Sequence, residues 1–536
     1  MIRLAAISTA LVSLFASQDL VFDHLIKELQ SDDYEVQGRA AKDLEFMGAD
    51  VVPRLQKLAD SRDAGADLRD WCRKIVAKIE ANAKRIRDLV ERLASPEDPV
   101  KEKAERELRA MGRAAIPVLR AARTSEDKNL RLRADKLLRE LATPEELEAW
   151  DWEGKLEDGA VLDGFEYKFR FKQLTPVEKS VAAAVSASLK WLAHHQNPDG
   201  SWGAESFQRQ CAGDRCNGVG NPAFDEGLTA LALLAFLSAG HSHLSKDEHP
   251  DPVTPGRTLN FGEAVKNGLK WLLARQAKDG RIGGPKEKYL YSHCIATMVL
   301  CEAYGMTGAR FLQMPAQLAV DFIVASQTPD RGWGYTSQAP SRSTVTGWAI
   351  AALKSADLAK LNVPLRECHE KARKWLDEVT DPTVYYRAGY DRKASGKVTV
   401  EGKNESFAHH ETMTAEAVVC RILMSKDKRD PALGGVAILV KDLPDWTPEN
   451  IDFYYWHWTT LALYAYDGPN GPHWKKWWGP VQNAIVNNLK TLKDGCQNGS
   501  WPSANERWGF EGGRVYATAL NCITLLTSAR LPKTGK

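Results

Sequence analysis

Residues 196–203 read Gln196-Asn-Pro-Asp-Gly-Ser-Trp202-Gly203, and this stretch decides how the rest of the chain is interpreted. Partial copies occur further along the chain as Gln276-Ala-Lys-Asp-Gly280, Gln327-Thr-Pro-Asp-Arg-Gly-Trp333-Gly334 and Gln497-Asn-Gly499-Ser-Trp501. Asp-Gly and Asn-Gly pairs favour turns. We expect each glutamine side chain to tie a helix end to the following turn, while the tryptophan packs over that turn.

Two kinds of helix alternate around these turns. Residues 264–273 are amphipathic, whereas residues 228–237 are apolar nearly all round and must be buried on every side. Each apolar helix contains a small residue, which we call its anchor: Thr229, Ala296, Thr346, Thr414, Thr459 and Ala517. The spacings of 67, 50, 68, 45 and 58 residues vary as loop insertions would make them. We therefore predict an all-α protein whose main part is an α/α toroid with six inner and six outer helices.

The Gln and Trp spacing resembles the QW repeats of squalene and terpene cyclases, whose toroid is shared with the β subunits of protein prenyltransferases. The resemblance covers positions 180 to 530. It implies the fold more than the chemistry, since the repeats are structural in that family. Squalene-hopene cyclases carry an Asp-x-Asp-Asp-Thr-Ala acid motif, and the matching positions here read His410-Glu411-Thr412-Met413-Thr414-Ala415. Thr412 stands where the protonating aspartate would be, so the resemblance does not imply standard cyclisation.

Candidate site residues follow from the anchors. The residues three positions before them are Glu226, His293, Ser343, Glu411, Trp456 and Arg514. If the inner helices all point the same way, these residues ring one end of a central cavity. We predict Glu411, His410, Glu226 and Asp452 as catalytic residues, because carboxylates and imidazoles suit general acid–base chemistry. The predicted ligand-binding residues are His293, Tyr291, Trp456, His457, Tyr455 and Arg514.

Structural roles are open alternatives for the same residues. Acidic residues at helix N-termini complement the helix dipole, and aromatic clusters pack at a toroid rim. We predict no metal ligands, because His409-His410-Glu411 with His293 and Glu226 lacks a recognised ligand spacing; zinc or another divalent metal held by this set is the open alternative. We expect no cofactor. Cys211 and Cys216 flank a short loop, and we predict a disulfide between them in an oxidising compartment. Zinc binding by this pair would need two further ligands that the sequence does not reveal.

The first part of the chain is a different kind of sequence. Only Trp71 of the 17 tryptophans lies before position 150. Residues 29–55 match residues 93–119 at an offset of 64, and each copy reads as a helix, a Met-Gly stop and a second helix opened near a proline. Such paired helices resemble HEAT-type repeats. We expect a docking surface or spacer rather than an enzyme.

The ends and the composition bound the remaining possibilities. Arg3 followed by an apolar run over residues 4–15 predicts a signal peptide over residues 1–18, with a buried N-terminal helix as the alternative. We therefore expect an exported protein, periplasmic or extracellular. The formal charge of +2 leaves no excess of positive charge for binding nucleic acid. No later stretch is long and apolar enough to span a membrane.

The predicted organisation is a signal peptide over 1–18, HEAT-like repeats over 19–145, a linker with a short strand over 146–175, and the toroid over 176–530. The strand is predicted from the alternation of Phe165, Tyr167, Phe169 and Phe171 with charged residues.

Three functions remain open from the sequence. The first is a cavity that binds a terpenoid or other lipid, which requires an apolar floor. The second is a carbohydrate-active lyase or hydrolase that binds a glycan, which requires carboxylates facing an open cleft. The third is a non-enzymatic scaffold whose HEAT-like arm binds a protein partner.

Overall fold

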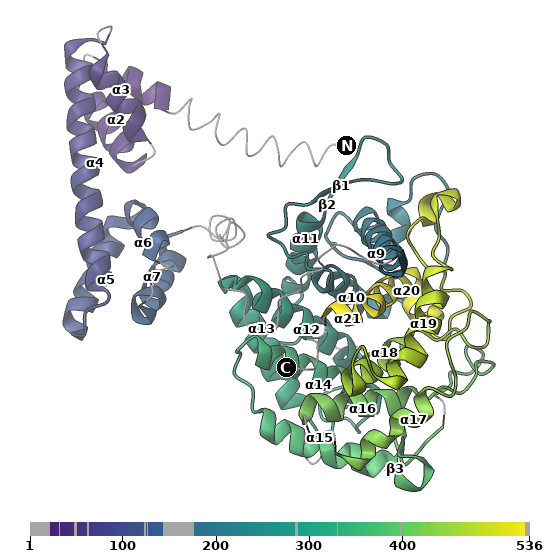
Figure 1. Cartoon of the computed structure of the whole chain (residues 1–536). Helices are drawn as coiled ribbons and strands as arrows, with labels where there is room; N and C mark the ends of the chain where they lie inside the picture. The colour runs from purple at the N-terminus through teal and green to yellow at the C-terminus, as the bar shows by residue number, and fades with distance from the viewer. Residues whose placement is uncertain are drawn as a thin grey trace. The chain divides into compact units, whose positions relative to one another are not determined.

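The computed structural model describes residues 22–31, 33–47, 51–61, 64–122, 125, 127–142, 176–284, 288–329, 331–396, 398–425, 427 and 429–530 (Figure 1). The chain divides into two compact units, one over Met1–Glu153 and one over Gly154–Lys536. The predicted signal peptide and the predicted strand at Phe165–Phe171 lie outside the described residues. No helix among the described residues is long and apolar enough to cross a membrane.

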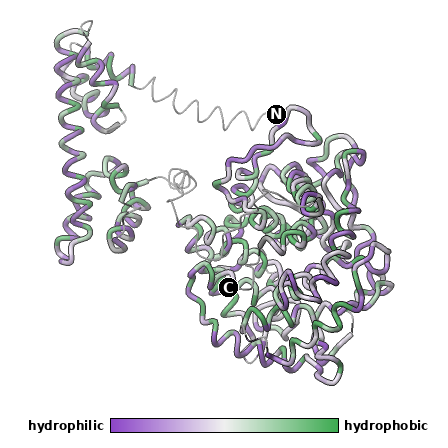
Figure 2. The backbone as a smooth tube through the Cα atoms, in the orientation of Figure 1, coloured by the Kyte–Doolittle hydropathy of each residue, from purple (hydrophilic) through white to green (hydrophobic). Residues whose placement is uncertain are grey.

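The first unit is built from helices whose boundaries repeat. Helix α2 (Tyr34–Met47) and helix α5 (Asp98–Met111) begin and end 64 residues apart, as the sequence offset predicts. Helices α3 (Val52–Asp60) and α6 (Ile116–Ala122) also begin 64 residues apart. The long helix α4 (Ala66–Arg92) and α7 (Lys128–Leu141) complete the two copies, and apolar and polar residues alternate around α4 (Figure 2).

Each copy buries its own apolar core. Leu44, Leu55 and Cys72 belong to the first core, and Leu108 and Leu119 belong to the second. Two helical repeats packed in this way confirm the paired-helix pattern, whereas the HEAT-like assignment stays a prediction.

The second unit is a closed α/α toroid, as predicted. Its inner helices are α10 (Asp225–Ser238), α12 (Tyr289–Thr307), α14 (Ser343–Leu358), α16 (Thr412–Met424), α18 (Phe453–Asp467) and α20 (Gly509–Leu525). Each inner helix packs against the next, and α20 packs against α10, which closes the ring. These helices have few polar faces because both sides are covered; on α10, every residue from Glu226 to Ser238 is buried.

The outer layer alternates with the inner one along the chain. Its long helices are α9 (Pro176–His194), α11 (Phe261–Leu273), α13 (Arg310–Ser326), α15 (Leu365–Val379) and α19 (Pro472–Val486). The remaining outer position is taken by α17 (Val436–Leu439), a single turn that follows the 3-10 helix η6 (Pro431–Gly435). Among the described residues, the strands form two short hairpins, β1 (Glu248–Pro250) with β2 (Thr258–Asn260), and β3 (Thr380–Asp381) with β4 (Arg387–Ala388).

Three of the four motif glutamines, Gln196, Gln276 and Gln327, tie consecutive outer helices together. Gln196 Nε2 donates to the carbonyl of Gly200 in its own turn, at 2.9 Å, and to the carbonyl of Ala264 on α11, at 2.8 Å. Gln276 and Gln327 make the same pair of bonds to their own turns and to α13 and α15. The motif therefore fixes the step from one repeat to the next.

A glycine is required at the tip of the turn. Gly200 has a φ of 94°, and a Cβ there would lie 2.2 Å from the carbonyl oxygen of Asn267 on α11. Gly280 and Gly499 have the same conformation and equally close backbone neighbours.

The tryptophans connect the turns to the inner helices. Trp202, Trp333 and Trp501 are fully buried, and each donates its indole N–H at 2.7 Å to a carbonyl of the preceding outer helix. The backbone N–H groups of Trp202 and Trp333 donate in turn to the hydroxyls of the anchors Thr229 and Thr346. The anchor threonines are thus hydrogen-bond acceptors for the motif turns.

Candidate functional site

The central cavity is lined by the first turns of all six inner helices. It has a volume of about 170 Å³. The lining residues from these first turns include Gly227, Tyr291, Thr344, Thr412, Tyr454 and Gly512. Since every inner helix begins at this cavity, the six helices point the same way, which is the condition that the sequence analysis required.

Glu411 is the carboxylate that the fold places at the cavity with the most polar partners. Arg387 pairs with it through Nη2 to Oε1 at 2.7 Å, and His409 lies 3.5 Å from the same oxygen. The hydroxyl of Thr414 donates to Oε2 at 3.2 Å. Burial alone would raise the pKa of Glu411, but the hydrogen bonds from His409 and Arg387 outweigh it and lower the pKa. The carboxylate is therefore ionised at neutral pH.

His410 also lines the cavity, and the buried Asp452 orients its imidazole ring. Its Nδ1 lies 3.4 Å from Oδ2 of Asp452, and its ring stacks on Tyr455 at 4.7 Å between centroids. Asp452 is the N-cap of α18, where Oδ1 accepts from the backbone N–H of Tyr455 at 2.9 Å. Burial would raise the pKa of Asp452, but the contact with His410 outweighs burial and lowers it. Asp452 is thus a positioning residue for the imidazole, because it is 1% exposed and does not line the cavity.

The buried side of the cavity carries polar aromatic groups. Trp348 Nε1 donates to the hydroxyls of Tyr291 and Tyr454, at 3.0 and 3.1 Å. The Tyr454 hydroxyl donates to Oε1 of Glu416 at 2.5 Å. Burial raises the pKa of Glu416 to about 8, so this carboxyl is neutral over most of the physiological range. Apolar side chains complete the wall: Leu231, Ile295 and Leu520.

The solvent-facing side of the cavity is charged. Lys288 Nζ lies 3.7 Å from Oε1 of Glu511, and Asn221 donates to Oε2 of the same carboxylate at 2.8 Å. Arg507 lines the cavity and is held by the backbone carbonyls of Ala408 and Val398 at 2.7 and 3.0 Å. Arg507 is only 3% exposed and its Nε lies 3.7 Å from Oδ2 of Asp452, so charges of both signs line the cavity.

Several predicted ligand-binding residues have structural roles away from the cavity. His293 is fully buried; its Nδ1 accepts from the N–H of Ile282 at 3.0 Å, and Nε2 faces the carbonyl of Ala319 at 3.1 Å. In its repeat, His293 accepts the backbone hydrogen bond of the turn that Thr229 and Thr346 accept in theirs, because the anchor of that repeat is Ala296, which has no hydroxyl. Burial lowers the pKa of His293 to about 4, so the ring is neutral.

The aromatic cluster of α18 divides between core and cavity. Tyr455 donates to the carbonyl of Leu439 at 2.9 Å, Trp456 packs on Phe453, and His457 lies 3.1 Å from the hydroxyl of Thr524. All three are at most 1% exposed, and none is among the described residues that line the cavity. Of this cluster only Tyr454 reaches the cavity, because one face of an inner helix points inward.

Glu226 and Arg514 are likewise outside the cavity lining among the described residues. Glu226 is 8% exposed on the first turn of α10. Arg514 is fully buried and donates to Asn217 and Ser500, so it fixes a loop rather than a ligand. Of the ten residues predicted as catalytic or ligand-binding, Glu411, His410 and Tyr291 line the cavity.

Cys211 and Cys216 are free thiols in the structure rather than the predicted disulfide. Their loop brings both close to Cys496 and His195, which the sequence analysis did not connect with them.

Other cavity residues were not predicted as site residues: Lys288, Tyr335, Trp348, Tyr390, His409, Arg507, Trp508, Glu511 and Tyr516. Most come from loops and from later turns of the inner helices. The rule used in the sequence analysis, which we call the anchor rule, takes only the residue three positions before each anchor. His409 and Glu511 flank the predicted positions, and the sequence places both near the same ends of the inner helices without assigning them to the site.

No family model and no curated protein matches the chain. Solved structures with a similar fold include an α-1,6-mannanase of Salegentibacter sp. HEL1_6 in complex with α-1,6-mannotriose, with 10% identity and a TM-score of 0.43 over 65% of this chain and 99% of that one. A D-mannose isomerase has 11% identity and a TM-score of 0.43 over 66% and 99%. The GH76 α-mannanase of Bacteroides thetaiotaomicron has 12% identity and a TM-score of 0.42 over 66% and 96%. Likeness at this level carries no argument about activity.

The expectation of a terpenoid or other lipid ligand is wrong. The solved structures just described are two mannanases and a mannose isomerase, and none of the three is described as binding a terpenoid or other lipid. The buried side of the cavity combines the hydroxyls of Tyr291 and Tyr454 with apolar side chains such as Leu231, Ile295 and Leu520. The α/α toroid fold is confirmed, and the expected lipid ligand is not.

Proposed function

We propose that the toroid is a carbohydrate-active enzyme whose active site is the central cavity. The observation that carries the proposal is the meeting of an ionised Glu411 with an Asp452-oriented His410 in one cavity walled by aromatic side chains. Proton donors and acceptors beside aromatic faces are what a saccharide requires, since sugars stack through their C–H faces and hydrogen-bond through their hydroxyls.

The aromatic walls supply the stacking surface. Trp348, Trp508, Tyr335 and Tyr390 line the cavity. The Tyr335 and Tyr390 hydroxyls lie 2.7 Å apart, so this part of the wall is already hydrogen-bonded before a ligand enters. A preformed wall lowers the entropic cost of binding.

The charge arrangement favours a neutral polar ligand. Glu411 is paired with Arg387, and Glu511 lies near Lys288. Paired charges of opposite sign present hydrogen-bond donors and acceptors without a large net field. We therefore favour a neutral saccharide over a polyanionic one.

Glu411 and His410 divide the proton transfers between them. Glu411 is held ionised, which suits a base or a stabiliser of positive charge at the sugar ring. His410 Nδ1 faces the Asp452 carboxylate, which leaves Nε2 for a proton at the substrate. The same two groups serve a hydrolase or a lyase, and the products distinguish these reactions.

Several finer assignments belong to this proposal. The QW-type repeats support kinship with the toroids of squalene cyclases and prenyltransferases at the level of fold. The apolar run over residues 4–15 supports export, and the paired-helix unit supports a docking arm for a protein partner.

The test is a panel of neutral and acidic oligosaccharides incubated with the full chain, with products separated by chromatography and mass spectrometry. We expect turnover of at least one neutral oligosaccharide, with loss of turnover in Glu411→Gln. Glu205→Gln, at an exposed position, is the matched control and retains turnover.

A hydrolase releases products that each gain water, and a lyase releases an unsaturated product without water. Failure to bind or convert any member of the panel contradicts the proposal and leaves the scaffold hypothesis in its place.

A further inference from the structure

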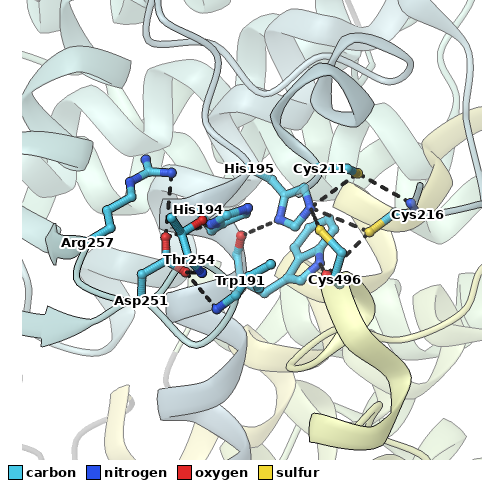
Figure 3. Close-up of polar contacts among 10 residues, drawn as sticks. Trp191, His194, His195, Cys211, Cys216, Asp251, Thr254, Arg257 and Cys496 are labelled. Atoms are coloured by element: carbon cyan, nitrogen blue, oxygen red, sulfur yellow. Dashed lines mark hydrogen bonds and ion pairs between the residues drawn. The ribbon is translucent and has the colours of Figure 1, made fainter. Parts of the chain in front are cut away.

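Three cysteines and a histidine converge where the first and last repeats of the toroid meet (Figure 3). His195 follows the last residue of α9, and Cys211 and Cys216 lie in the loop after the 3-10 helix η3 (Ser206–Gln210). Cys496 comes from the 3-10 helix η7 (Leu492–Gln497), far along the chain. One ligand atom from each of these four residues lies within 4.8 Å of the other three.

The distances match the edges of a tetrahedron around one metal ion. His195 Nε2 lies 3.7 Å from Cys211 Sγ, 3.5 Å from Cys216 Sγ and 3.3 Å from Cys496 Sγ. A zinc ion with Zn–S bonds of about 2.3 Å and a Zn–N bond of about 2.0–2.1 Å places nitrogen and sulfur about 3.6 Å apart. All three sulfurs are therefore at the right distance from the imidazole nitrogen.

The histidine is oriented as a metal ligand should be. Its Nδ1 lies 2.9 Å from the backbone carbonyl of Trp191. A carbonyl only accepts, so Nδ1 carries the proton and Nε2 presents its lone pair to the three sulfurs. This partner for the second ring nitrogen is the usual device that fixes the tautomer of a metal-bound histidine. The ring is also stacked on Trp191 at 4.2 Å, which fixes its plane.

We propose that His195, Cys211, Cys216 and Cys496 form a structural zinc site. Three sulfurs and one imidazole complete a four-coordinate shell without an open position, which is the arrangement of a structural rather than a catalytic zinc. His195, Cys216 and Cys496 are at most 2% exposed. None of the four is among the described residues that line the central cavity, so the site is independent of the proposed function.

The surrounding groups compensate the charge and hold the loop. Three thiolates and one zinc ion leave a net charge of −1, and the buried guanidinium of Arg514 interacts electrostatically with all three cysteines. Arg514 Nε donates to the carbonyl of Asn217 at 2.7 Å, and its backbone N–H donates to the carbonyl of Gly218 at 2.7 Å. The backbone N–H of Cys216 donates to Cys211 Sγ at 3.3 Å, a contact that stabilises a thiolate.

The site would lock the closure of the ring. Cys496 is 301 residues from His195, and its carbonyl accepts from Trp191 Nε1 at 3.1 Å. A cross-link over so long a separation removes a large amount of chain entropy from the unfolded state. The first and sixth repeats are neighbours in the ring, but the chain does not run directly from one to the other. Zinc bound here would link these two repeats.

The experiment measures metal content in the full chain, purified under reducing conditions without chelator and freed of loose metal by gel filtration. We expect about one zinc per chain by elemental analysis. Cys496→Ser and Cys216→Ser lose the metal. Cys368→Ser, which removes another buried free thiol on α15, is the matched control and keeps it.

A second measurement covers the case in which the site variants fail to fold. Chelator treatment of the unaltered protein lowers its melting temperature by several degrees, and Zn²⁺ alone restores it whereas Mg²⁺ does not. Replacement of zinc by Co²⁺ gives the sulfur-to-cobalt absorption bands of a tetrahedral thiolate site.

Either of two results overturns the inference. One is a folded protein that holds no stoichiometric metal and whose melting ignores both chelator and Zn²⁺. The other is a disulfide between Cys211 and Cys216 in the reduced preparation, seen as the mass loss of two hydrogens and as thiols that resist alkylation.

Discussion

Two His-His pairs in the toroid have nearly the same sequence and different surroundings. His194-His195 lies at the end of α9, and His409-His410 lies just before α16. In each pair the Nδ1 of one histidine faces an aspartate: His194 lies 2.8 Å from Asp251, and His410 lies 3.4 Å from Asp452. The other histidine of each pair differs, because three sulfurs surround His195, whereas the carboxylate of Glu411 lies beside His409.

The difference shows that neighbours from elsewhere in the chain decide what a histidine does. His195 is fully buried at a closed cluster, which suits a structural ligand. His410 faces a cavity whose solvent side is charged, which suits proton transfer to a bound molecule. The comparison therefore separates a stabilising pair from a reactive one, and the following changes test that separation.

The largest expected effect is at the cavity. His410→Ala lowers kcat on the converted saccharide by about 10²–10⁴-fold, because a positioned proton-transfer group is lost. The melting temperature also falls, because the buried Asp452 loses the partner that lowers its pKa. His473→Ala removes the histidine of another His–Asp pair, in which Nδ1 lies 3.0 Å from Asp467, and leaves kcat unchanged. Equal turnover in both variants contradicts a catalytic His410.

The next effect concerns the neutral carboxyl behind Tyr454. Burial raises the pKa of Glu416 to about 8 from its ordinary value of 4.5. A raised pKa in the folded state gives stability that is present below about pH 4.5 and is lost as the pH rises through about 8. Glu416→Gln stays neutral, so its stability relative to the unaltered protein rises over this interval by roughly 3–5 kcal/mol. Urea unfolding at three pH values measures the difference, and parallel curves would show that Glu416 is ionised throughout.

A smaller effect is expected at His195, where the first and last repeats of the toroid meet. His195→Ala lowers the free energy of unfolding by about 2–4 kcal/mol, because a buried ring and its hydrogen bond to Trp191 are lost. The cavity keeps its residues, so ligand binding per folded molecule is unchanged. Chemical denaturation of this variant beside His473→Ala provides the measurement. A stability loss no greater than that of His473→Ala would contradict the structural role of His195.

The smallest effect sharpens the role of Glu411. Arg387 lowers the pKa of this carboxyl, so Arg387→Ala raises that pKa. Activity that requires ionised Glu411 is present above its pKa, and the acidic limb of the pH profile therefore moves to higher pH. Lys371→Ala, which removes a lysine paired with Glu367 on α15, leaves the limb in place. An unshifted limb in Arg387→Ala would exclude Glu411 as the titrating group.

The repeats were predictable because their signals are local. Gln196, Gly200 and Trp202 act within one turn and on the next helix, so their spacing alone indicates the step between repeats. The apolar helices were predictable for a related reason, since a segment without a polar face needs cover on every side. The site was predictable only in part, because the anchor rule cannot tell an inward-facing position from a buried one. Glu411 and His293 occupy equivalent positions, yet only Glu411 reaches the cavity.

The sequence by itself determined the all-α toroid, its anchors and the turns that link its repeats, because hydrophobic periodicity and turn chemistry depend on neighbours within a few residues. Only the tertiary structure decided which polar residues share the cavity and which cysteines meet. Ring closure brings Cys496 to His195 across 301 residues of chain. No pattern of spacing records that approach, since it is produced by the packing of six helix pairs around a common axis.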